Sequence, residues 1–261
     1  MILGLVFPPL DEILRWKPLF GHGDLAFNKI GLIAFLAAAA TLAIFFAAGS
    51  KAKKSVVPTG VQNMAEVSVD FVREQIVLQA MGEHKEDLAW TGYLLVLFFF
   101  VLFSNSTEVI PFFQMPATAR MGIPLFLALI SWIAFIVMGV KKSGAGYLKA
   151  AVVPPGVPFL MLFLAVPIEI ISTFLVRPFS LAVRLFANML AGHLLLVTFS
   201  VMGHDLLLAK TKQVFLIPMT VLPFILFILI TIFEVLVIVL QAYIFTILTA
   251  VYLGGAMHPE H

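Results

Sequence analysis

Apolar runs of about 20 residues or more recur along this sequence, and this feature restricts its fold more than any other. Hydrophobic residues make up 62% of the chain and charged residues 11%, whereas ordinary water-soluble domains carry about 25% charged residues. A transmembrane β-barrel would instead show alternating apolar residues in segments of about 10. The pattern therefore predicts an all-α polytopic membrane protein.

Five runs are expected to cross the membrane, and the whole chain is expected to form a single transmembrane domain. The expected parts are an outer-side N-terminal segment at 1–26, a first span at 27–49, an interfacial helix at 58–82, a helical hairpin at 88–140, and two long helices at 157–253. Residues 58–82 carry Glu66, Asp70 and Arg73 among apolar residues at helical spacing, which favours an amphipathic helix lying on the membrane surface. The first residues lack the basic region of a cleavable signal peptide.

The last two apolar runs are longer than one perpendicular crossing requires. As unbroken helices they would reach roughly 66 Å and 58 Å, so each is expected to tilt, bend or break. Pro218 and Pro223 mark the start or a bend of the final helix.

Lysine and arginine in the loops predict the orientation of the chain. Five crossings place eight basic residues on one side and six on the other, and the tight lysine clusters all belong to the larger group. That side is taken as cytoplasmic, with the N-terminus outside and the C-terminus inside.

Polar residues deep in the long helices are the candidates for function, because intramembrane charges are costly and usually mark ion pathways. They are Glu169, Arg177, Arg184, Asn188, His193, Glu234 and Gln241. Arg184 and Asn188 are four residues apart and share a helix face, whereas His193 lies nine residues beyond Arg184, on about the opposite side.

This set suits proton transfer. Glu169, His193 and Glu234 can load and release protons, whereas Arg184 stays charged and can block a direct leak. Other interpretations remain open, because His193 with Glu234 suits a structural pair, and Asn188 with Gln241 suits hydrogen bonding between helices.

Residues outside this set receive simpler interpretations. Arg177 is interpreted as an anchor at a helix end and is left out of the chemistry. Asn105 and Glu108 are candidates for an aqueous entrance. The cluster at 83–87 is interpreted as a hydrated loop and not a metal site, and His258 and His261 as a solvated terminus. The absence of cysteine excludes thiolate chemistry, the net charge of +2 argues against nucleic-acid binding, and no metal or cofactor is expected.

Two stretches carry a family resemblance. The stretch from Arg184 to His193, Arg-Leu-Phe-Ala-Asn-Met-Leu-Ala-Gly-His, and the stretch from Leu240 to Tyr252 closely resemble subunit a of the F-type ATP synthase membrane sector. The order of the apolar runs is also similar to that family. The resemblance implies a non-catalytic stator subunit that passes protons to and from carboxylates of a rotating ring of c subunits.

The resemblance also implies roles for single residues. Arg184 matches the essential arginine between two half-channels, and Gln241 the glutamine near it. His193 and Glu234 match the pair lining the outer half-channel, and Glu169 the acid near the inner one. The implied partners are the c-ring, b-type peripheral stalk subunits, other ATP synthase subunits and membrane lipid, and the implied location is a bacterial plasma (inner) membrane.

Three alternatives differ from this assignment in what the sequence should contain. A sodium-coupled version of the same subunit keeps the same architecture, although the pairing of His193 with Glu234 favours protons. A stand-alone ion transporter predicts inverted repeats, which the sequence does not show convincingly. An intramembrane metalloprotease needs paired metal ligands on a span, such as His-Glu-x-x-His, and His193 is the only deep histidine.

Overall fold

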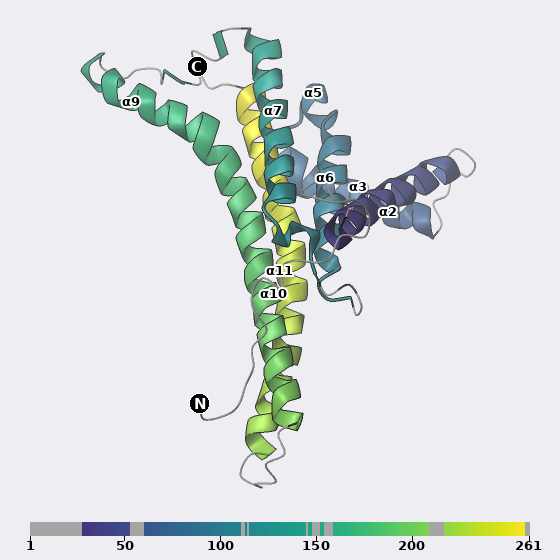
Figure 1. Cartoon of the computed structure of the whole chain (residues 1–261). Coiled ribbons are helices and arrows are strands. Elements are labelled where there is room, and N and C mark those ends of the chain that lie inside the picture. The colour runs from purple at the N-terminus through teal and green to yellow at the C-terminus, as the bar shows by residue number, and fades with distance from the viewer. Residues whose placement is uncertain are drawn as a thin grey trace.

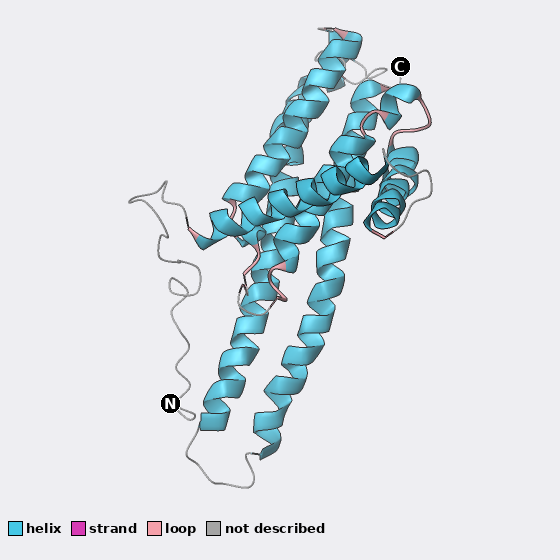
Figure 2. Cartoon of the chain, turned by 90° about the vertical axis from the view of Figure 1, so that its right-hand side faces the viewer, coloured by secondary structure: helices cyan, strands magenta, loops and turns pink. Residues whose placement is uncertain are grey.

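Helices form all the regular structure among the residues that the structure describes. The structure is a computed structural model, and it describes residues 28–52, 60–110, 113, 115–144, 146–147, 152–153, 159–208 and 217–258. The predicted N-terminal segment at 1–26 lies outside these residues, as does His261. Both views of the chain show that long helices dominate the described residues (Figures 1 and 2).

The helices follow one another in a simple order. They are α2 (Lys29–Ala52), α3 (Val61–Val72), η1 (Arg73–Val77), α4 (Leu78–Ala80), α5 (Lys85–Leu88), α6 (Thr91–Ser106), η2 (Ala117–Ala119), α7 (Gly122–Ser143), α9 (Phe159–Ile171), η3 (Ser172–Val176), α10 (Arg177–Leu208) and α11 (Ile217–Met257). The segments η1 and η3 are π-helical, and η2 is a short 3₁₀ turn.

Five helices of the described chain are long and apolar enough to cross a membrane. They cover Lys29–Ser50, Lys85–Ser106, Gly122–Lys142, Met161–His204 and Val221–Met257. This confirms the predicted number of spans and the two long C-terminal helices. Exposed apolar side chains such as Phe46 (80%) and Phe163 (89%) cover the outside of the helices, as expected for a surface that faces lipid.

The segment before the second span is amphipathic. Ala65, Val72 and Ile76 are buried, whereas Asp70 and Arg73 are exposed. The buried side contacts α2, α6 and α11, so the rest of the bundle holds this segment in place.

The two long C-terminal helices form an antiparallel pair. Figure 1 shows α10 and α11 running side by side and extending well beyond α6 and α7. The preceding helix, α9, continues into α10 through η3 and leans away from α11 in the same view. Pro167 and the π-helical turn both interrupt regular α-helical hydrogen bonding, which accounts for the predicted bend.

The core lies where α6, α7 and the upper part of the α10–α11 pair meet. Its fully buried side chains include Leu94, Val101, Phe135, Leu185, Met189, Phe245 and Leu253. Because these residues come from four helices, the core fixes the two long helices against the hairpin.

We expect Gly254→Ala to destabilise the fold, because α11 approaches the end of α4 very closely at this residue. A Cβ on Gly254 would lie 2.7 Å from the carbonyl oxygen of Ala80 and 3.1 Å from the Cα of Met81. Such overpacking against backbone costs about 1–3 kcal/mol. The measurement is the thermal unfolding midpoint of the purified protein in detergent.

Gly255→Ala is the matched control, because a Cβ there meets no atom within 4 Å. Alanine is favoured over glycine inside a helix by about 0.5–1 kcal/mol, so this variant should not lower the midpoint. Equal midpoints for the two variants would contradict the close approach at Gly254.

Candidate functional site

Arg184 lies on the exposed side of α10. Ala187, Asn188 and Ala191 continue the same exposed stripe at spacings of three and four residues. Among the described residues, Arg184 forms no ion pair or hydrogen bond. A permanently charged guanidinium therefore projects from the exposed surface of α10 without a partner among the described residues.

Asn188 connects this stripe to the last helix. Its Nδ2 donates a hydrogen bond of 2.8 Å to Oε1 of Gln241. Gln241 is buried, and its Nε2 has no hydrogen-bond partner among the described residues. The two amides thus fix α10 against α11 one turn from Arg184, as the sequence interpretation allowed.

His193 and Glu234 both lie in the interior, on the other side of α10 from Arg184. Their exposed fractions are 5% and 3%. The carboxylate of Glu234 rests against the backbone of Gly192, so closely that a Cβ on Gly192 would lie 2.1 Å from Oε1. Gly192, the residue before His193, therefore makes the space in which the carboxylate of Glu234 sits.

The predicted entrance residues lie in the same interior region. Asn105 and Glu108 are buried at the end of α6, and Thr118 donates its hydroxyl to Oδ1 of Asn105. Neither carboxylate oxygen of Glu108 has a hydrogen-bond partner among the described residues, and Glu108 is close enough to Glu234 for their charges to interact. Buried polar atoms without a partner cost about 1–3 kcal/mol each unless they are hydrated.

Lys29 is a member of this region that sequence reasoning missed. It begins α2 and interacts electrostatically with His193 on α10. In the sequence it is one of several loop cations, and nothing in its local pattern indicates a neighbour so far along the chain.

Glu169 lies apart from these residues, at the other end of the long helix. Its carboxylate is 3.4 Å from the guanidinium of Arg177 and accepts a 3.3 Å hydrogen bond from Thr173. Glu169 and Arg177 are eight residues apart, which would not align them in an α-helix. The wider turn of η3 absorbs about one residue, so the two side chains share a face.

The interpretation of Arg177 as an anchor at a helix end is wrong. The helix is continuous through this residue, from α9 to α10. The guanidinium pairs with Glu169 and lies 5.6 Å from the ring centroid of Tyr252 on α11. Its contacts are therefore within the protein, and no local sequence pattern indicates the π-helical turn that creates them.

Comparisons with known proteins agree on one family. The family model described as ATP synthase A chain matches residues 31–254. A protein of Frankia alni named ATP synthase subunit a is 47% identical over 260 residues, covering 97% of this chain and 87% of that protein. Proteins of the same name from Rhodococcus erythropolis and Streptomyces lividans are 41% and 37% identical, covering 97% and 99% of this chain and 90% of each relative.

The match extends through every described helix that carries a candidate site residue, from α6 to α11. The chain belongs to the ATP synthase subunit a family.

Proposed function

We propose that Arg184 is the fixed charge that separates two half-channels for protons in this subunit. Membership of the family makes the chain a non-catalytic, multi-pass membrane subunit of the ATP synthase proton channel. The observation that carries the residue-level proposal is the exposed guanidinium of Arg184 on α10, which has no partner among the residues that the structure describes.

In this proposal, a carboxylate on the rotor supplies the negative charge that pairs with Arg184. An ionised carboxylate is costly in lipid, so a rotor carboxylate must be protonated while it faces the membrane. Near Arg184 its ionised form is favoured, because opposite charges within about 4–6 Å stabilise each other. Small residues beside Arg184, Ala187 and Ala191, allow a partner helix to approach closely. The stripe therefore suits contact with a ring of c subunits.

The interior cluster suits one half-channel. His193 and Glu234 exchange protons, and the unpartnered buried atoms of Asn105 and Glu108 favour water between them. Lys29 keeps positive charge near His193. These groups come from α2, the end of α6, α10 and α11. The proton path therefore lies between helices and does not follow a single helix.

Glu169 belongs to the opposite half-channel in this proposal. Its carboxylate and the guanidinium of Arg177 are both about one-third exposed, so water reaches the pair. An ion pair that is exposed to water is worth only about 0–1 kcal/mol, which leaves the carboxylate available for proton exchange.

Two further parts of the proposal are the orientation of the chain in the membrane and its partner subunits. We infer from the loop charges that the C-terminus faces the cytoplasm of a bacterial plasma membrane. One proton crossing about 100 mV supplies about 2.3 kcal/mol, so many crossings must be summed by rotation. This requirement supports the c-ring and a peripheral stalk of b-type subunits as partners.

Arg184→Ala should abolish ATP-driven proton pumping without preventing assembly of the complex. Arg184→Lys should fail as well, because lysine can lose its proton and lacks the planar guanidinium. Pumping is measured in inverted membrane vesicles with a pH-sensitive dye, in a medium without sodium. Arg73→Ala is the matched control, since Arg73 is an exposed arginine of η1 outside the proposed path.

Normal pumping by Arg184→Ala would refute its role between the half-channels. Pumping by the wild type that appears only when sodium is added would instead support the sodium-coupled alternative.

His193→Ala should slow pumping, because one exchange group of the half-channel is lost. The exchanged variant His193→Glu with Glu234→His should pump faster than either single change, since both groups can still transfer protons. Pumping rates from pH 6 to 8 test this, because that interval lies within the range of about pH 5 to 8 in which histidine ordinarily changes its charge. Wild-type rates for His193→Ala across that range would exclude it from the path.

Gly192→Ala should also impair pumping, because its methyl group would occupy the position of the Glu234 carboxylate. Adding Glu234→Asp shortens that side chain and should restore part of the rate. Gly203→Ala on the same helix is the control, since its Cβ would lie 3.2 Å from the ring of Phe224 and requires only a small shift. Equal rates for Gly192→Ala and the control would contradict the packing of Glu234 against Gly192.

A further inference from the structure

The C-terminal end of α11 lies against the loop between α4 and α6, which includes the single turn α5 (Lys85–Leu88). Gly254 allows this contact, because only a residue without a Cβ fits beside the carbonyl of Ala80. The backbone N–H of His258 donates a 2.8 Å hydrogen bond to the carbonyl of Gly254, so His258 continues the same helical turn. Its imidazole therefore projects over the loop, and the interpretation of His258 as a solvated terminus is wrong.

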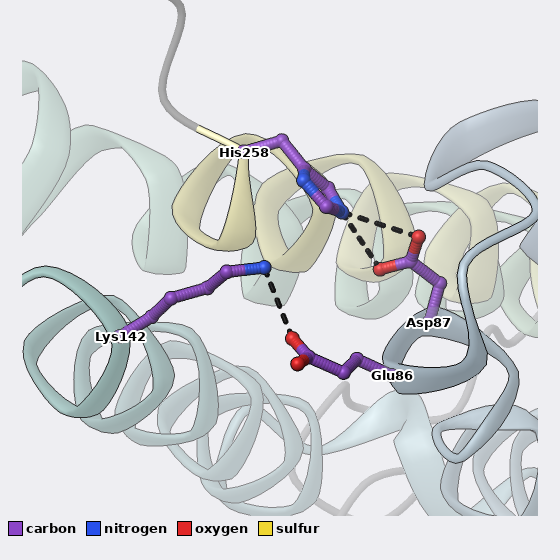
Figure 3. A network of polar contacts seen from close by, with 4 residues as sticks. All are labelled: Glu86, Asp87, Lys142 and His258. Atoms are coloured by element: carbon purple, nitrogen blue, oxygen red, sulfur yellow. Dashed lines mark hydrogen bonds and ion pairs between the residues drawn. The ribbon is translucent and has the colours of Figure 1, made fainter.

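The imidazole of His258 contacts the side chain of Asp87. Its carboxylate is fully buried, and its two oxygens lie 3.0 and 3.1 Å from Nε2 of His258 (Figure 3). The same loop provides a second imidazole, because His84 precedes Asp87 by about one turn and its ring centroid lies 5.0 Å from that of His258. One ligand atom from each of the three residues lies within 4.8 Å of the others.

A simple hydrogen bond between Asp87 and His258 does not explain why the imidazole of His84 lies beside them. Two imidazole nitrogens and one carboxylate oxygen are a donor set that zinc uses in proteins, with a water molecule in the fourth position. In a tetrahedral site the ligand atoms are about 3.3 Å apart, which is close to the 3.0 Å between Asp87 and His258. Small side-chain rotations of the exposed His84 would complete the arrangement.

The surroundings favour a cation. Glu86 interacts electrostatically with both His84 and His258, and its carboxylate forms a 3.0 Å ion pair with Lys142 at the end of α7 (Figure 3). Gly82 precedes the loop with φ of 117°, and a Cβ there would lie 3.5 Å from Oδ2 of Asp87. The absence of a side chain at Gly82 leaves this side of the carboxylate open.

We propose that His84, Asp87 and His258 bind one divalent transition-metal cation of the zinc type. Binding requires neutral imidazoles and an ionised carboxylate, so the proton between Nε2 of His258 and Asp87 moves to Nδ1 or to solvent when the metal arrives. The bound cation joins the last turn of α11 to the loop before α6. It thereby fixes the end of the helix that carries Glu234 and Gln241.

The test uses the intact complex, purified in detergent, stripped with a chelator and dialysed against zinc. Metal analysis should find one more equivalent of zinc in the wild type than in His84→Ala or His258→Ala. Cobalt replaces zinc as a visible probe, and its absorption band should be lost in both variants. We expect each variant to weaken binding about tenfold or more. Comparison within the same complex cancels metal held by other subunits.

Both imidazoles are partly exposed, so these variants should fold. Two controls separate the site from other groups. Glu83→Gln alters a neighbouring carboxylate, and His22→Ala with His261→Ala removes the two histidines outside the described residues, so both should bind as the wild type does.

Equal zinc content in the wild type and His258→Ala would overturn the proposal and leave a simple Asp–His pair. Loss of zinc from the His22 and His261 control, with binding kept in His84→Ala, would overturn it as well.

Discussion

The close antiparallel contact between α10 and α11 determines where the candidate proton-path residues lie. Along α10 the contacts pass from Arg177 through Asn188 to Gly192, while their partners on α11 run in reverse order from Tyr252 to Glu234. One helix alone would leave Gln241 and Glu234 facing lipid. Paired, the helices bury both side chains and leave the guanidinium of Arg184 outside.

The burial of polar groups explains why the long helix pair needs the hairpin formed by α6 and α7. In lipid, unsatisfied polar groups cost several kcal/mol each, so the interior must supply partners or water. Asn105, Glu108 and Thr118 come from the end of α6 and from η2, which packs against α10. The hairpin thus contributes polar groups to the proposed half-channel and also packs its apolar residues into the core.

The sequence predicted the spans, the long helix pair and the opposite placement of Arg184 and His193, because these follow from local apolar runs and helical periodicity. Contacts between distant residues were not accessible in the same way. Asp87 and His258 are 171 residues apart, and their contact depends on the close approach at Gly254. Lys29 reaches His193 only because α2 crosses the bundle, and a single sequence carries no signal for that crossing.

The π-helical turn η3 acts as an insertion of one residue that the helix has absorbed without breaking. Removing one residue between 172 and 176 would leave Glu169 and Arg177 seven residues apart in an ordinary α-helix, where they would still lie on nearly the same face. If η3 instead became α-helical with all its residues kept, Glu169 would turn by about 80° away from Arg177, whereas Arg184, Asn188 and His193 would keep their positions on α10. The orientation of Glu169 relative to α10 is therefore determined within η3, separately from the contacts that hold Asn188 and Gly192 against α11.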